Sequence, residues 1–137
     1  MKLLLDTHVF LWAADGDPQL PASVRAMLED TGNQILVSSV SIWEIVIKAE
    51  AGRQLQWKSS EDINGLETWV RRMGAEILPI AAQHALGLWA LRDWDHKDPF
   101  DRMLTAQAIA EQATLVTADL ELQNRTGLKW VWAAPQT

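Results

Sequence analysis

The sequence predicts an α/β protein: a three-layer α/β/α sandwich in which helices cover both faces of a central, mostly parallel sheet. Two observations support this prediction. Short apolar runs, such as KLLL at residues 2–5 and QILV at 34–37, are typical of strands buried on both faces of a sheet. These runs alternate with helical patterns, an order typical of parallel strands that are joined by crossover helices.

The expected elements follow one another along the whole chain. A turn at Asp15-Gly16-Asp17-Pro18 ends the first helix, and Pro99 suits the first turn of a later one. A polar loop at residues 92–97 precedes Pro99. The expected strands are 2–5, 34–37, 76–78, 114–116 and 129–132, and the expected helices are 7–14, 23–29, 38–51, 60–74, 81–91 and 99–112.

Composition limits the possible classes of function. With 137 residues and 48% hydrophobic content, we expect a single domain over residues 1–137. No apolar run approaches the roughly 20 residues of a membrane-spanning helix, and the start lacks the features of a signal peptide. Because the chain has no cysteine, it cannot form disulfides or thiolate zinc sites, and we expect a cytoplasmic protein without a membrane partner.

Acidic side chains fall close to the ends of the expected strands. Asp6 directly follows the first strand, and Asp119 comes three residues after the fourth. Glu44 lies in the apolar stretch SIWEIVI, early in the helix after QILV, whereas Asp98 and Asp101 begin the helix in HKDPFDR. Because ligands of open parallel sheets bind beyond the carboxyl ends of the strands, these acids are expected together at one sheet edge.

Each of these acids also has a purely structural explanation. Asp6 can cap the helix that follows it, and Asp119 can cap or close a turn. Glu44 can occupy a narrow polar stripe of its helix. Asp98 and Asp101 can interact with the positive end of the helix dipole, and for Asp98 this explanation and a metal-binding role are both open.

Carboxylates gathered at one edge repel one another. Two unit charges about 4 Å apart repel by about 4 kcal/mol at an effective dielectric of 20, and no lysine or arginine adjoins Asp6 or Glu44 in the sequence. A divalent cation removes this repulsion, and Mg²⁺ or Mn²⁺ prefers carboxylate and water oxygens. We therefore expect Asp6 to bind a metal that orients a phosphodiester and activates water.

Three stretches of the chain resemble PIN-domain proteins, in particular the VapC-type ribonuclease toxins of bacterial toxin–antitoxin pairs. These stretches, in the order that the family has them, are LLLDTHVFLWA, VSSVSIWEIVIKAEAG and DPFDRMLTAQAIAEQATLVTAD. The resemblance implies a PIN-like fold and a Mg²⁺-dependent endoribonuclease, with Mn²⁺ as a second possible metal. It also implies the residues of the catalytic, metal-binding quartet, which are Asp6, Glu44, Asp101 and Asp119, with Asp98 as a possible further ligand.

The resemblance further implies three partners: an RNA substrate, a cognate antitoxin, and a second copy of the chain in a homodimer. Two other functions stay open. One is a degenerate PIN fold that serves only as a protein-interaction module. The other is a phosphatase-like hydrolase, which usually has a second aspartate two residues after the first; here His8 occupies that position.

Several polar residues around the expected site have two readings. Thr7 and Thr117 can bind a ligand water or a phosphate, or can simply cap. His8 and His96 flank the site but are not expected to bind metal, because a lone histidine does not make a zinc centre. His84 is expected to be an ordinary helix residue.

The net charge of −6 argues against binding nucleic acid through a broad basic surface. Phosphate contacts must then come from a few basic side chains, each of which also suits a solvated surface. The nearest candidates in the sequence are Arg92, Lys97, Arg102, Lys48 and Arg53.

Overall fold

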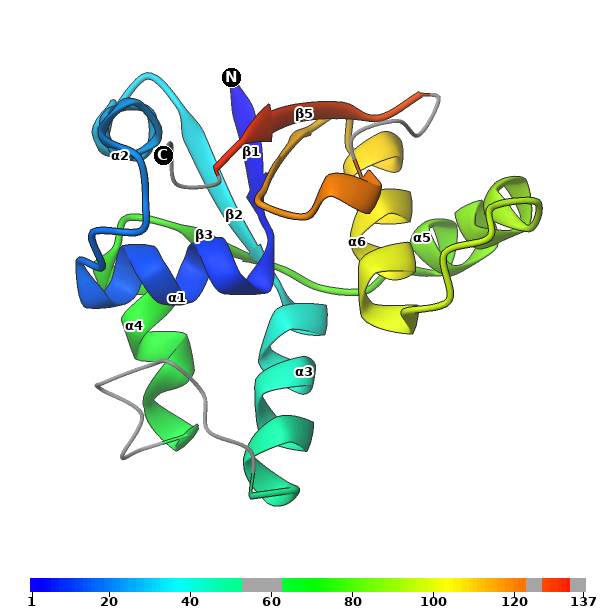
Figure 1. The fold of residues 1–137 in the computed structure, drawn as a ribbon, viewed down its shortest axis with the longest axis horizontal. Coiled ribbons are helices and arrows are strands. Elements are labelled where there is room, and N and C mark those ends of the chain that lie inside the picture. Colours follow the sequence, from blue (N-terminus) through cyan, green and yellow to red (C-terminus); the bar gives the residue numbers. More distant parts are fainter. Residues whose placement is uncertain (53–62, 123–126, 134–137) are drawn as a thin grey trace.

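The computed structural model describes residues 1–52, 63–122 and 127–133. The strands are β1 (Lys2–Leu5), β2 (Gln34–Ser38), β3 (Glu76–Leu78), β4 (Thr114–Thr117) and β5 (Lys129–Trp132). They form one sheet in the order β3-β2-β1-β4-β5, and each neighbouring pair is parallel. Figure 1 shows this sheet with β1 near its centre. All five expected strands are confirmed, although β2 and β4 each extend one residue further.

The helices follow the expected order. They are α1 (Thr7–Asp15), α2 (Ala22–Glu29), α3 (Ser39–Glu50), α4 (Leu66–Arg72), α5 (Ala82–Gly87) and α6 (Pro99–Ala110), with 3₁₀ turns η1 (Ile63–Gly65), η2 (Leu88–Leu91) and η3 (Leu120–Leu122). The expected helix 81–91 is divided into α5 and η2 at Gly87, a residue type of low helix propensity. The expected helix 60–74 corresponds to η1 and α4, and its expected start at residue 60 lies outside the described residues.

Alternate residues of the central strands pack against different helix layers. Leu3 and Leu5 face a core that is shared with α1, α2 and α4, whereas Leu4 faces a core that is shared with α6. The first cluster also contains Phe10, Val24, Ile35, Val37 and Val70, and the second contains Leu36, Leu104, Ala108 and Leu115. Because a strand residue and the next one point to opposite faces, this division gives the three-layer α/β/α arrangement that the sequence predicts.

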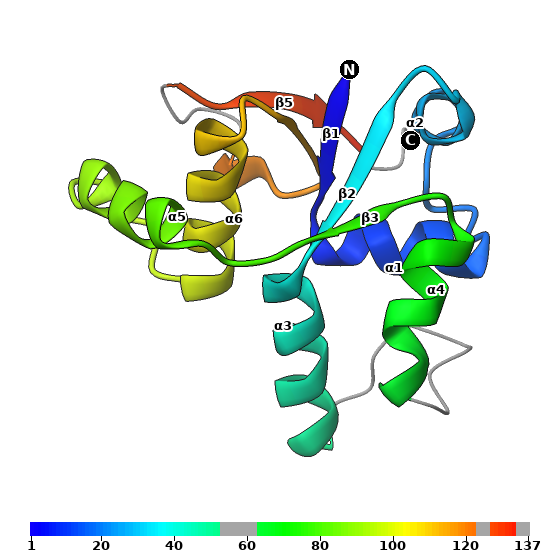
Figure 2. The ribbon, with the colours of Figure 1, turned by 180° about the vertical axis from the view of Figure 1, so that it is seen from behind.

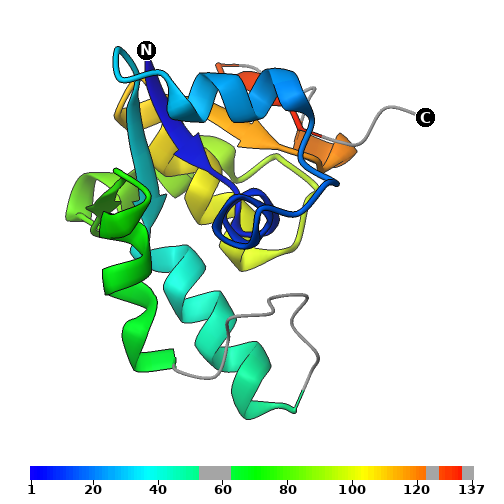
Figure 3. The same ribbon diagram turned by 90° about the vertical axis from the view of Figure 1, so that its left-hand side faces the viewer.

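The carboxyl ends of β1 and β2 pass directly into helices. Asp6 alone separates β1 from α1, and β2 ends at Ser38, whose hydroxyl accepts the backbone N–H of Val40 and so caps α3. In Figure 3, α3 and α4 extend away from the sheet beyond these ends. Figure 2 shows α5 beside α6 on the other side of the molecule. None of the helices in the described ranges is long and apolar enough to span a membrane.

Candidate active site

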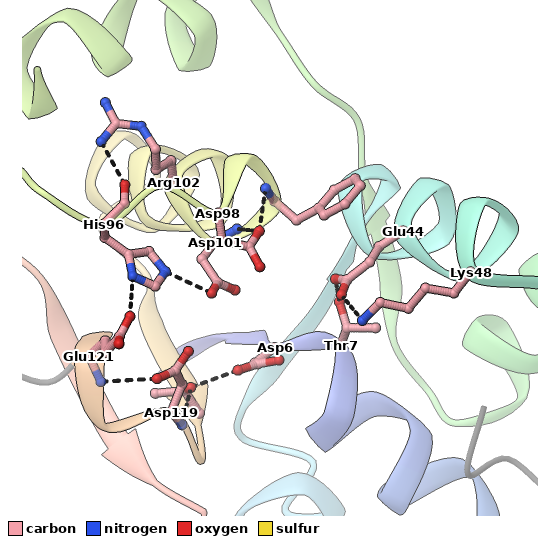
Figure 4. A network of polar contacts seen from close by, with 12 residues as sticks. Asp6, Thr7, Glu44, Lys48, His96, Asp98, Asp101, Arg102, Asp119 and Glu121 are labelled. Atoms are coloured by element: carbon pink, nitrogen blue, oxygen red, sulfur yellow. Dashed lines mark hydrogen bonds and ion pairs between the residues drawn. The ribbon is translucent and has the colours of Figure 1, made fainter. Parts of the chain in front are cut away.

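An open pocket of about 720 Å³ lies where β1 and β4 end and where α3 and α6 begin. All five sequence-predicted acids line this pocket: Asp6, Glu44, Asp98, Asp101 and Asp119. Figure 4 shows their carboxylates pointing toward a shared space from opposite walls. The tertiary structure thus brings together residues that are up to 113 positions apart, from 6 to 119.

Asp6 caps a helix and lines the pocket at the same time. Its Oδ1 accepts the backbone N–H of His8 at 3.2 Å, which is the N-cap bond of α1. Its Oδ2 accepts the hydroxyl of Thr117 at 2.7 Å. Burial raises the pKa of Asp6 above its usual range, the Thr117 hydrogen bond opposes that rise, and the nearby charge of Glu44 adds to it. Asp6 therefore both caps α1 and lines the pocket, so its capping role does not exclude a role in metal binding.

Glu44 is almost fully buried and is held at both carboxylate oxygens. The Thr7 hydroxyl donates to Oε1 at 2.7 Å and lies 2.9 Å from the Ser41 hydroxyl. Lys48 donates to Oε2 at 2.6 Å. No basic residue is adjacent to Glu44 in the sequence, but Lys48 follows four positions later, and residues four apart on a helix lie on the same face. This spacing is readable from the sequence, so the pair could have been found there.

Asp98 and Asp101 hold different positions at the start of α6. Asp98 is exposed, and its Oδ1 accepts the backbone N–H groups of Phe100 at 2.9 Å and Asp101 at 3.2 Å, so it is the N-cap. Burial raises the pKa of Asp101 to about 7; the His96 hydrogen bond opposes this rise, and the charges of Asp6, Asp98 and Asp119 increase it. The charge of Asp101 is thus disfavoured without a cation, as is that of Asp6.

Asp119 lies opposite Asp101 on the wall that follows β4. Its backbone N–H donates to Thr117 Oγ1 at 3.0 Å, and its Oδ1 accepts the backbone N–H of Glu121 at 2.9 Å. One possible ligand atom from each of Asp101, Asp119 and His96 lies within 4.8 Å of the other two. These atoms are close enough to share one metal ion.

His96 has a larger part in the site than the sequence suggests. Its Nε2 lies 2.9 Å from Asp101 Oδ2, its Nδ1 contacts Glu121 Oε2, and its ring stacks on Trp94 with centroids 4.9 Å apart. Burial lowers the pKa of His96, but the hydrogen bonds and charges of Asp101 and Glu121 outweigh that effect and raise it. Its place in the polar loop before α6 is the signal that pointed to it.

Of the other basic candidates, Arg92 and Arg102 are engaged elsewhere, Lys97 is exposed in a loop, and Arg53 lies outside the described residues. The Arg102 guanidinium donates to backbone carbonyls, and that of Arg92 donates to Trp89 O and lies over the Trp89 ring at 4.6 Å. Lys97 is exposed in the loop before α6, and Arg53 falls outside the described part. Lys48 therefore remains the one lysine or arginine among the described residues that line the pocket.

His84 lies in helix α5, as the sequence predicts, and does not line the acidic pocket. Its side chain is buried, its Nδ1 accepts the backbone N–H of Ala81 at 2.9 Å, and its Nε2 lies 2.9 Å from Glu111 Oε2. Its pairing with Glu111 holds α5 against the end of α6, away from the acidic pocket.

The residues present suit a hard divalent cation. The donor set consists mainly of carboxylate oxygens, which Mg²⁺ and Mn²⁺ prefer. Burial, together with the charges of neighbouring carboxylates, raises the pKa values of Asp6 and Asp101. A divalent ion in this pocket would keep both groups ionised.

Comparisons with known proteins agree with this fold. A model of the PIN domain family matches residues 3–128. Among solved structures, the chain is similar to one from VapBC2 of Rickettsia felis bound to a DNA fragment from their promoter: 22% identity, TM-score 0.73, with 97% of this chain and 99% of that chain covered. DNA-bound VapBC from Salmonella typhimurium gives 20% identity, TM-score 0.70 and coverage of 96% and 97%. VapBC-1 from nontypeable Haemophilus influenzae gives 22% identity and a TM-score of 0.69, with 96% of this chain and 98% of that chain covered. No curated protein matches the chain in sequence.

Proposed function

The chain belongs to the PIN domain family, and on this premise we propose that it is a metal-dependent endoribonuclease that acts as a toxin of the VapC type. The observation that carries the proposal is the gathering of five acids, from four separate parts of the chain, around one pocket. The resemblance of the three sequence stretches to VapC-type ribonucleases supports RNA as the substrate.

In this proposal the quartet Asp6, Glu44, Asp101 and Asp119 holds Mg²⁺, or alternatively Mn²⁺. Asp6 and Asp101 would ligate directly, and Glu44 and Asp119 would complete the site directly or through water. When bound, the ion supplies a Lewis acid for a phosphodiester oxygen and an activated water at neutral pH. Asp98, which caps α6, remains a possible further ligand.

The surrounding residues orient the four carboxylates. Thr117 holds Asp6 by its hydroxyl, and Thr7 holds Glu44 in the same way. The hydroxyl groups of Thr7 and Thr117 therefore donate hydrogen bonds to acids of the site. Because both oxygens of Asp6 and both oxygens of Glu44 accept hydrogen bonds, the directions of these carboxylates are fixed, and the second lone pair of each oxygen remains available to a ligand.

Lys48 is the basic side chain that we propose for phosphate contact. Its ammonium group lines the pocket and pairs with Glu44 at 2.6 Å. With a cation held by Glu44, the ammonium group of Lys48 would lose part of its electrostatic partner and would be available to an RNA phosphate oxygen. A single well-placed lysine is compatible with a chain of net charge −6.

We further propose a cognate antitoxin as the protein partner, a homodimer as the assembly, and the cytoplasm as the location. The similar structures described above carry the name VapBC, which supports the antitoxin. A basic or arginine-bearing antitoxin segment is expected to cover the acidic pocket, since a cation there reduces the same repulsion as a metal. Expression of the chain alone should arrest growth, and co-expression with an adjacent small upstream reading frame should relieve the arrest.

The test of the enzyme is cleavage of a total RNA pool by the purified protein. Cleavage should stop in EDTA and return with excess Mg²⁺ or Mn²⁺, and the products should carry a 5′-phosphate and a 3′-hydroxyl. RNA cutting that persists in chelator, after contaminating nucleases are excluded, would overturn the metal mechanism. Antitoxin binding without any RNA cleavage would instead identify an interaction module.

A further inference from the structure

We propose that His96 is a positioning residue for Asp101: it holds one carboxylate oxygen of Asp101 and connects the two walls of the pocket. This inference rests on the proposed metal site, which it deepens. His96 itself is not assigned a metal-ligand or catalytic role. Its effect on metal binding passes through the carboxylate that it orients.

The contacts of the imidazole ring carry the first step. The side chain of His96 is 8% exposed, and its Nε2 lies 2.9 Å from Asp101 Oδ2. When Asp101 is ionised, as it would be with a bound cation, its carboxylate oxygen only accepts and the ring N–H is the donor. With Oδ2 held by this bond, Oδ1 is the freer oxygen for a ligand in the pocket that Asp101 lines.

The ring itself is fixed to the helix that carries Asp101. Trp94 stacks against it with an interplanar angle of 23°. The neighbour of Asp101 on α6, Arg102, donates to the backbone carbonyls of Trp94 at 3.0 Å, His96 at 3.1 Å and Leu91 at 3.2 Å. The loop 92–97 is therefore attached to α6, and His96 has little freedom to leave Asp101.

The second ring nitrogen reaches the opposite wall. His96 Nδ1 contacts the carboxylate of Glu121 in η3, and the backbone N–H of Glu121 donates to Asp119 Oδ1 at 2.9 Å. The connection thus runs from Asp101 through His96 and Glu121 to Asp119, as Figure 4 shows. It spans the space in which the two aspartates would share a metal, and so it links the two walls that carry them.

A direct ligand role for His96 fits these contacts less well. Both ring nitrogens already face carboxylates, so a metal would have to displace Asp101 or Glu121 from one of them. Residues that hydrogen-bond to metal ligands typically change metal affinity by 10–100-fold when they are replaced. We therefore expect the effect of His96 to appear as a change in metal affinity, beyond any change in stability.

The experiment measures Mg²⁺ affinity by calorimetry and by the metal-induced rise of the melting temperature, beside an RNA cleavage assay. His96→Phe keeps a ring for Trp94 but removes both donors, so the dissociation constant for Mg²⁺ should rise at least about tenfold. His96→Gln places an amide N–H near the position of Nε2 and should restore most of the affinity. His96→Asn is too short to reach Asp101 and should behave like His96→Phe.

The matched control is the buried histidine outside the pocket. His84 pairs with Glu111 at the same 2.9 Å, so His84→Phe should lower the melting temperature and leave the Mg²⁺ dissociation constant unchanged. If the three His96 variants lower only the melting temperature, as His84→Phe does, the positioning role is wrong. If His96→Gln loses as much affinity as His96→Phe, histidine is a ligand and the proposal is likewise overturned.

The experiment also covers a variant that does not fold and a failure of the proposed function. Should His96→Phe fail to fold, the comparison of His96→Gln with His96→Asn decides between the same outcomes. Failure of the proposed function itself is seen separately, because wild-type protein would then bind no Mg²⁺ in the calorimeter and cut no RNA.

Discussion

Thr117 donates its hydroxyl to Oδ2 of Asp6 at 2.7 Å and joins the carboxyl ends of β4 and β1 in the middle of the sheet. The two residues are 111 positions apart. The same hydroxyl accepts the backbone N–H of Asp119. One side chain therefore contacts two of the four acids of the proposed metal site, at the carboxylate of Asp6 and at the backbone of Asp119.

The first prediction concerns this hydroxyl. Thr117→Val keeps the shape of the side chain but leaves the buried Asp6 oxygen without its donor, which should destabilise the fold by about 1–3 kcal/mol and weaken Mg²⁺ binding. The measurement is a denaturant titration with and without Mg²⁺. Thr105→Val is the control: its buried hydroxyl has no hydrogen-bond partner among the described residues, so stability should hold or rise. Equal losses in both variants would contradict the assigned role of Thr117.

The second prediction concerns Asp101. Asp101→Asn removes one negative charge at nearly constant shape, so Mg²⁺ binding and RNA cleavage should fall while metal-free stability holds or rises by about 1 kcal/mol. At a hundred times the dissociation constant, Mg²⁺ should stabilise the wild type by about 2.7 kcal/mol, and the variant by far less. Melting curves for Asp101→Asn and for Asp95→Asn, an exposed acid of the loop 92–97, give the comparison. Normal RNA cleavage and the full Mg²⁺-induced stabilisation in Asp101→Asn would show that Asp101 is not part of the metal site.

The third prediction concerns pH. The pKa of Asp101 is about 7 in the fold against 3.8 ordinarily, so the folded state binds a proton more tightly than the unfolded chain. The resulting stability is fully present below about pH 4 and is lost as the pH rises through about 7. The raised pKa values of Asp6 and His96 act in the same direction. The lowered pKa of Glu111 acts oppositely, but only below its ordinary value of 4.5.

Between pH 5 and about 7.5, the metal-free protein should therefore melt at lower temperature as the pH rises. Saturating Mg²⁺ should reduce this slope, because a bound cation favours the ionised carboxylates, and Mg²⁺ affinity should increase with pH. Thermal melts at several pH values with EDTA or Mg²⁺ check both effects. A slope that Asp101→Asn leaves unchanged would exclude Asp101 as its main source.

The fourth prediction concerns Lys48. Lys48→Met removes the ammonium group but retains an apolar stem, so KM for RNA should rise by about tenfold, the cost of about 1.4 kcal/mol of phosphate contact. Mg²⁺ affinity should hold or rise, because a cation that competes for Glu44 is gone. Arg71→Met is the control, since Arg71 forms an exposed i,i+4 pair with Glu67 on α4 at 3.7 Å. Loss of Mg²⁺ binding in Lys48→Met would mean that the lysine serves the carboxylate and not the substrate.

Much of the fold can be predicted from local patterns in the chain. Apolar runs as short as KLLL and QILV mark strands, and the positions of Asp6 and Asp98 mark helix starts, because these signals depend on neighbours within a few residues. The common edge of the acids also follows from local order, since parallel strands with helical crossovers place their carboxyl ends together. The ion pair of Lys48 with Glu44 can also be predicted from local sequence, because residues four apart on a helix lie on the same face.

Contacts across the fold were decided only by tertiary structure. Arg102 could contact phosphate as far as its sequence shows, but the fold turns its guanidinium onto the carbonyls of a neighbouring loop. The sequence places His84 on a helix, but only the packing of α5 on α6 buries it beside Glu111. His96 meets Asp101 and Glu121 because the loop 92–97 folds back over α6. The physical reason is range: propensity and periodicity act along a few residues, whereas these hydrogen bonds and the raised pKa of Asp101 depend on which distant groups are buried together.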